Sequence, residues 1–200
     1  MGSTIRAAPG WRNWSDAPDL KSGGSRAVRV RLPPPASMDA RLIRAELGDE
    51  DDVLFAIADR LTEEMDDELS DEAAILAEAT PGQRAVYLLF TAGAEIAGGG
   101  LRGYLESESG RTVAETAVAA AEAGAGEHAA ILRELEGVFP GGGVPVDDDA
   151  RADALDLLGD DAVAELELLE ARWEEREGEL RELLEARVEA TPDEFFRDPG

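Results

Sequence analysis

Residues 80–110, TPGQRAVYLLFTAGAEIAGGGLRGYLESESG, form the most apolar long segment of the chain after residue 45. Thr80, Pro81 and Gln83 together make a capping box with proline at the first helical position. Apolar residues then recur at helical spacing and make a wide apolar face: Val86, Tyr87, Leu89, Phe90, Ala94 and Ala97. We expect the helix to end in Gly98–Gly100, because glycine takes the left-handed conformation that closes a helix. A helix this apolar belongs in the middle of a domain.

The sequence before this segment predicts three more helices. The first runs from Ser37 to Leu47 and ends at Gly48. The second follows Asp49 and has one apolar stripe, made of Leu54, Ile57, Ala58, Leu61 and Met65. A third, short helix starts at Ser70 and turns Ile75 and Leu76 inward.

The sequence after the central segment is also helical in pattern. We expect Thr112 to cap a helix with Glu115 as its partner, and an aspartate run at 147–149 to start another helix through the macrodipole. Residues 160–190 carry one apolar stripe with a break near Arg176–Gly178, and 191–194 repeat the Thr-Pro capping box. No strand-like alternation stands out. The fold class we predict is all-α, a single-domain bundle of about eight helices spanning 38–200.

Charge is the main compositional feature, because 19 basic side chains face 45 acidic ones and give a net charge of −26. Such a surface repels nucleic acids and anionic membranes and attracts basic partners. The chain has no cysteine and no apolar run near the roughly 20 residues that span a bilayer. We therefore expect a cytoplasmic protein with no membrane contact, and no direct nucleic acid binding by the acidic domain.

Residues 1–37 differ from the rest, and through Met38 they hold six basic side chains against two acidic ones. Their Gly-Gly and Pro-Pro-Pro runs predict a disordered tail. One interpretation is a basic arm that docks on the acidic domain or on nucleic acid. The interpretation we prefer is an upstream extension, with Met38 as the natural start.

Motifs within and after the central segment resemble the bacterial DNA-mimic-protein family, a domain of unknown function. The order Glu95-Ile-Ala-Gly-Gly99-Gly100-Leu, then Tyr104-Leu105, then Ser107-Glu-Ser109-Gly110, is similar to the family signature. Thr112–Val118 continues it, and Phe139-Pro140-Gly-Gly with Pro145, Asp147 and Arg151 matches a later motif. The resemblance covers about residues 50–197. It implies structural roles for Glu95, Gly99, Gly100, Tyr104, Ser109, Gly110, Phe139 and Pro140.

Three side chains depart from the family pattern. Gly98 and Ser107 stand where the family has asparagine, and Leu101 stands where it has phenylalanine. The glycines that shape the turn are kept. This favours a retained fold over retained roles for the three replaced side chains.

No motif in the chain predicts catalysis or a cofactor. His128 is the single histidine, and without a nucleophile motif beside it we expect a surface or partly packed residue rather than a general base. Gly98–Gly100 lacks the lysine of a phosphate loop, and Asp147–Asp149 lacks the glycine and glutamate of a calcium loop. We therefore predict no enzyme activity, no metal and no cofactor.

Two acidic faces are the candidate binding sites. Residues 46–78 hold fourteen acidic side chains against Arg60 alone, whereas residues 172–189 pair their acids with arginines at i,i+4. Carboxylates three or four residues apart lie roughly 5–6 Å apart at Cβ, so rows on two helices approximate spaced phosphates. We expect the partner to contact residues 49–72 first and 147–161 second: Asp51, Asp52, Asp59, Glu63, Glu64, Asp66, Asp67, Asp71, Asp147, Asp148 and Asp149.

The preferred function is an acidic protein-interaction domain, a DNA mimic that sequesters a basic DNA-binding regulator, and the resemblance points the same way. One alternative is a neutraliser of a basic toxin or nuclease. A second alternative is a helical domain whose acidity reflects solubility or salt adaptation. A homodimer through the apolar stripe Trp173–Val188 is a further possibility.

Overall fold

The structure, a computed structural model, describes residues 40–48, 52–65 and 72–197. In this part of the chain there are eight α-helices and no named strand, so the predicted all-α class is confirmed. The helices are α1 (Val53–Met65), α2 (Glu72–Glu78), α3 (Pro81–Glu106), α4 (Val113–Glu122), α5 (Gly126–Gly137), α6 (Asp148–Asp156), α7 (Asp160–Glu174) and α8 (Glu177–Ala190). Three short 3-10 helices complete the set: η2 (Arg44–Glu46), η3 (Glu108–Thr112) and η4 (Pro192–Glu194).

The central helix is α3, which packs against α1, α4, α6, α7 and α8. Its predicted capping box is present: the Gln83 backbone N–H donates to Thr80 Oγ1 at 3.2 Å, and the Thr80 N–H donates to Gln83 Oε1 at 3.1 Å. Val86 and Leu89 on its apolar face are fully buried. Even α3, like every other helix of the described residues, is too polar or too short to cross a membrane.

The predicted end of this helix at Gly98–Gly100 is wrong. Gly98 and Gly99 stay helical, and α3 continues to Glu106 after a kink at Gly100, where φ is 68° and ψ is −175°. The kink frees the backbone N–H of Leu101, which donates to Glu170 Oε2 of α7 at 2.7 Å. A carboxylate from a distant helix thus caps the second part of α3, and sequence spacing gives no sign of it.

Segment 40–48 is extended apart from η2, so the predicted helix from Ser37 to Leu47 is wrong over the described residues. Leu42 forms a parallel bridge with Phe196. Its N–H donates to the Phe195 carbonyl at 2.9 Å, and its own carbonyl accepts from Arg197 N–H at 2.9 Å. Pairing with the C-terminal segment satisfies backbone groups that a helix would have satisfied internally.

Two further predicted caps are wrong because the threonine hydroxyls donate to carbonyls instead. Thr112 Oγ1 donates to the Ser109 carbonyl at 2.7 Å, and makes no cap for α4. Thr191 Oγ1 donates to the Arg187 carbonyl at 3.0 Å and makes no cap for η4. In both cases a carbonyl of the preceding helical turn accepts the hydroxyl, which competes with the capping arrangement.

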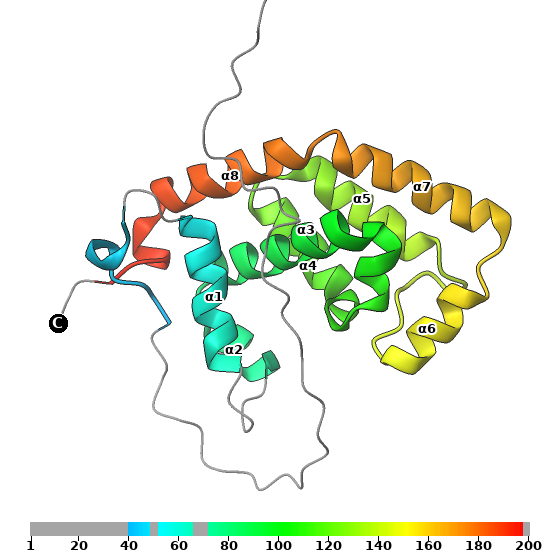
Figure 1. Cartoon of the computed structure of the whole chain (residues 1–200), viewed down its shortest axis with the longest axis horizontal. Helices are drawn as coiled ribbons and strands as arrows, with labels where there is room; N and C mark the ends of the chain where they lie inside the picture. The colour runs from blue at the N-terminus through cyan, green and yellow to red at the C-terminus, as the bar shows by residue number, and fades with distance from the viewer. Residues whose placement is uncertain (1–39, 49–51, 66–71, 198–200) are drawn as a thin grey trace, which may run out of the picture.

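Helices α7 and α8 follow one another along one long edge of the molecule, with α6 at one end and the C-terminal residues at the other (Figure 1). The predicted break between them lies at residues 175 and 176. Their shared apolar stripe, Trp173, Leu180, Leu184 and Val188, is buried in the main core. This stripe therefore does not supply the dimer surface that the sequence analysis considered.

Candidate interaction surface

The first predicted acidic face lies partly on α1. Asp59 and Glu63 are exposed, and Glu64 is half-buried. Arg60 pairs with Glu63 at 3.4 Å and with Glu64 at 2.5 Å, so one arginine serves two of the acids. The remaining predicted residues of this face, Asp51, Asp66, Asp67 and Asp71, lie outside the described residues.

Asp52 has a structural role at the start of α1. Its Oδ1 accepts from the backbone N–H groups of Leu54 at 3.0 Å and Phe55 at 3.2 Å, which caps the helix. Its Oδ2 accepts from Arg181 Nη2 of α8 at 2.6 Å. Both oxygens are thus engaged, and Asp52 joins α1 to α8 rather than presenting an open carboxylate.

The second predicted face, residues 147–161, begins with three aspartates that have different surroundings. Asp147 caps α6 as expected, because its Oδ1 accepts from Ala150 N–H at 2.9 Å. Asp148 Oδ1 accepts from Arg151 Nη2 at 2.7 Å. Asp149 is exposed and has no ion pair within the described ranges. One of the three carboxylates is therefore open to a partner.

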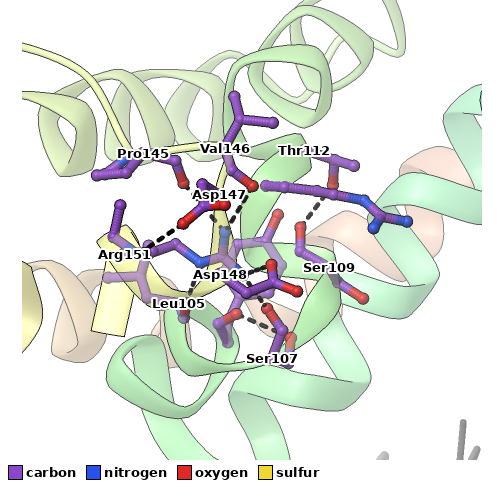
Figure 2. Close-up of polar contacts among 12 residues, drawn as sticks. Leu105, Ser107, Ser109, Thr112, Pro145, Val146, Asp147, Asp148 and Arg151 are labelled. Atoms are coloured by element: carbon purple, nitrogen blue, oxygen red, sulfur yellow. Dashed lines mark hydrogen bonds and ion pairs between the residues drawn. The ribbon is translucent and has the colours of Figure 1, made fainter. Parts of the chain in front are cut away.

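Arg151 organises the turn next to this face (Figure 2). It is 1% exposed, and all five of its N–H groups are used. Nε donates to the Leu105 carbonyl at 2.6 Å, and the remaining acceptors are the carbonyls of Ser107 (2.7 Å), Pro145 (3.0 Å) and Val146 (3.3 Å) with the Asp148 carboxylate. One buried guanidinium thereby holds together the end of α3, the loop after Phe139 and the first turn of α6.

Two motif residues, Gly110 and Tyr104, lie in tightly packed surroundings. A Cβ on Gly110 would lie 2.6 Å from the Leu105 carbonyl oxygen and 2.8 Å from that of Tyr104, so only glycine fits there. Tyr104 is buried, and its hydroxyl donates to Thr116 Oγ1 at 3.3 Å. Burial raises the pKa of the Tyr104 phenol above its ordinary value, so this hydroxyl stays a donor at neutral pH.

The other motif positions fall into two groups. Phe139 is buried in the core, and Gly100 makes the kink in α3. Glu95 and Ser109 are half-buried, whereas Gly99 and Pro140 are exposed. A Cβ on Gly99 would meet nothing within 4 Å, so the local packing does not require glycine at that position.

A further acidic set lies on α7 and α8, which run along one long edge of the molecule (Figure 1), and only its first two members, Asp160 and Asp161, fall in the predicted 147–161 face. We call it the α7–α8 ridge. Its carboxylates are exposed and make no ion pair with any described residue: Asp160, Asp161, Glu165, Glu167, Glu174, Glu175, Glu182 and Glu189. The first six occupy residues 160–175, about 24 Å of helix at roughly 1.5 Å per residue.

The sequence analysis passed over the ridge from Glu174 to Glu189 because i,i+4 spacing predicted that arginines neutralise the acids of residues 172–189. Arg181 does pair with Glu185 at 2.9 Å, but it is half-buried and also reaches Asp52. The other arginines also bind acids outside the ridge: Arg172 with Glu134 (2.5 Å), Arg176 with Glu179 (2.9 Å) and Arg187 with Glu194 (3.3 Å). The Arg172 hydrogen bond lowers the pKa of Glu134. Because these arginines pair with acids outside the ridge, the ridge carboxylates have no ion-pair partner among the described residues.

His128 is buried, contrary to the prediction of a surface or partly packed histidine. It is 1% exposed, and its ring meets the Trp173 ring edge-on with centroids 4.8 Å apart. Its Nε2 has no hydrogen-bond partner in the described part of the chain. Glu127 beside it is exposed, so the two side chains do not share a site.

Comparison with protein families gave one match. A family model described as DMP19-like protein, where DMP19 stands for DNA mimic protein 19, matches residues 77–191, more than half of the 200-residue chain. The matched region contains all the motif residues named above, as well as α6, the ridge up to Glu189, Arg151 and His128. No curated protein and no solved structure gave a significant match.

Proposed function

Because this chain belongs to the DMP19-like protein family, we propose that it is a DNA mimic that sequesters a basic DNA-binding protein. The observation that carries this proposal is the α7–α8 ridge, a set of exposed carboxylates along two consecutive helices that make no ion pair with described residues. A basic protein that docks on the ridge is kept from its DNA site.

The charge spacing along α7 supports this proposal. Six carboxylates over about 24 Å give roughly one charge per 4 Å of axis, and a single DNA strand carries about one per 3.4 Å. A row of arginines and lysines that reads one phosphate strand therefore meets a similar charge density here. The open carboxylates of Asp59 on α1 and Asp149 on α6 extend the proposed surface beyond the ridge.

A pull-down tests the proposal as a whole. The full chain is immobilised, exposed to lysate of its source cells, and eluted first with competing duplex DNA and then with salt. We expect one basic DNA-binding protein in the DNA eluate, because DNA and the mimic compete for the same surface. A partner released by salt alone favours a neutraliser of a basic toxin or nuclease. An empty eluate contradicts the proposal.

Charge reversal locates the surface once a partner is in hand. We expect Glu167→Arg with Glu174→Arg to weaken binding at least tenfold and to lower its salt dependence, because both carboxylates lie on the ridge. The matched pair on α1, Asp59→Arg with Glu63→Arg, tests the first face predicted from the sequence. If only the α1 pair weakens binding, the ridge is the wrong surface and the mimic proposal stands.

A further inference from the structure

The outer face of α7 carries apolar side chains between its carboxylates. Ala164, Leu168 and Ala171 are all exposed, and Leu168 is 62% exposed although it is a large apolar residue. Asp161 and Glu175 extend the series at the same 3-4 spacing. Because this spacing keeps residues on one face of a helix, the five form a stripe, which we call the α7 outer stripe.

The inner face of the same helix is already occupied. Leu166, Leu169 and Trp173 are buried in the main core, so α7 has apolar side chains on two sides. A helix at the surface of a domain needs only its inner apolar stripe to fold. Packing among the residues that the structure describes therefore does not account for the outer stripe.

We propose that the α7 outer stripe binds an amphipathic helix of the basic partner, apolar on its contact face and rich in lysine or arginine on both flanks. Small residues at positions 164 and 171 let a second helix approach to about 8 Å between axes, and Leu168 lies between them as the apolar anchor. The inference rests on the proposed function for the basic character of the partner.

The charges on both sides of the stripe favour a helix with basic flanks over a second copy of this chain. The residues that flank the contact face, in the e and g positions of a heptad, are Asp160, Glu165, Glu167, Glu174 and Arg172. Arg172 is held by Glu134 of α5, so the flanks present four open carboxylates. A second copy of this chain would bring glutamates against glutamates, which disfavours self-pairing, whereas a helix with basic flanks gains attraction on both sides.

A designed peptide tests the stripe directly. The probe is a labelled three-heptad peptide with leucine at a and d, lysine at e and g, and glutamine elsewhere. The control peptide has the same composition in an order that removes the apolar face. By fluorescence anisotropy with the full chain at physiological salt, we expect the probe to bind at least tenfold more tightly than the control. Equal binding would mean that charge alone holds the peptide, and would overturn the inference.

Two serine variants test whether probe binding depends on the leucine of the stripe or on any exposed leucine. We expect Leu168→Ser to weaken probe binding about tenfold. Leu157→Ser is the matched control, since Leu157 is 81% exposed and lies before α7, and it should leave binding unchanged. Circular dichroism checks that both variants keep their helix content. The inference fails if Leu168→Ser binds like the unmodified chain.

Amide chemical shifts in labelled protein give the location of the bound peptide. Changes concentrated at residues 160–175 support the stripe, and changes centred on α1 or α6 overturn it. Sedimentation of the chain alone tests whether a second copy of the chain binds the stripe instead. A dimer that Leu168→Ser converts to monomer would assign the stripe to self-association and overturn the inference. If the DNA-eluted partner binds Leu168→Ser normally, this inference fails while the proposed function stands.

Discussion

Arg151 shows how one side chain can hold a turn that lacks regular backbone pairing. Its guanidinium reaches four carbonyls and one carboxylate, and the carbonyls belong to two separate segments of the chain, Leu105 with Ser107 and Pro145 with Val146. A buried carbonyl without a donor is costly, so the arginine replaces the pairing that secondary structure supplies elsewhere.

Replacing Arg151 with methionine should lower the free energy of unfolding by about 3–5 kcal/mol, because several buried acceptors lose their donors. Urea unfolding followed by circular dichroism measures the change. Arg133→Met is the control, since Arg133 is exposed on α5, and should shift stability by less than about 0.5 kcal/mol. Equal effects of the two variants would contradict the role assigned to Arg151.

His128 is the second residue whose surroundings decide its chemistry. Burial lowers the pKa of its imidazole, as does the nearby charge of Arg176. The carboxylates of Glu179 and Glu127 and a hydrogen bond with the Arg176 backbone act in the opposite direction but do not overcome burial. The ring is therefore neutral at pH 7, and packs against Trp173 of α7.

A depressed pKa in the folded state makes stability fall as the pH falls. The unfolded chain takes up the His128 proton near pH 6.5, and the folded chain resists it, so acidification favours unfolding. Between pH 7.5 and 5.5 we expect the chain to lose about 1 kcal/mol more stability than His128→Phe does. Urea titrations of both proteins at the two pH values measure this. Parallel pH dependences would show that His128 does not titrate as described.

At the scale of the elements, α3 shows what local sequence decides and what it does not. The capping box at Thr80 lies within four residues, and it forms as the sequence predicts. The far end depends on Glu170, which lies on another helix, and the kink is therefore placed two residues later than the first glycine. Three successive glycines permit a break at any of them, and tertiary contact selects Gly100.

Replacing Gly99 and Gly100 in turn with alanine tests whether the kink requires glycine at position 100 but not at position 99. Gly100→Ala places a side chain at φ 68°, where its Cβ would overlap the Glu170 carboxylate, and should cost about 2 kcal/mol or more. Gly99→Ala lies in regular helix with open space beside it, and should stabilise by about 0.5–1 kcal/mol. Thermal unfolding of both variants tests the pair, and opposite signs are the expected result.

At the scale of the whole molecule, the positions of the charges, more than the net charge, decide which carboxylates are open to a partner. The net charge of −26 is known from composition, and the arginines of α7 and α8 do not neutralise the ridge because each is paired with an acid outside it. Uncompensated charge of one sign weakens the compact state through self-repulsion. The ridge therefore has a cost in stability that binding to a basic partner would offset.

This cost should respond to salt in a characteristic way. Raising sodium chloride from about 0.02 to 0.3 M shortens the screening length several-fold and should raise the melting temperature by about 5 °C. Little further increase is expected toward molar salt, since screening is then nearly complete. A melting temperature that keeps rising steeply at molar salt would instead support salt adaptation as the source of the acidity.

The sequence by itself determined the helical class, the central helix with its cap, the helix break near residue 176 and the membership in a DNA-mimic family. These features depend on periodicity and on residues close together in the chain, which is why they could be predicted. Only the tertiary structure decided which carboxylates are open. Arg181 meets Asp52 across 129 positions, and Arg172 meets Glu134 across 38, so no local spacing rule could show that these arginines leave Glu174, Glu182 and Glu189 without an ion pair among the described residues.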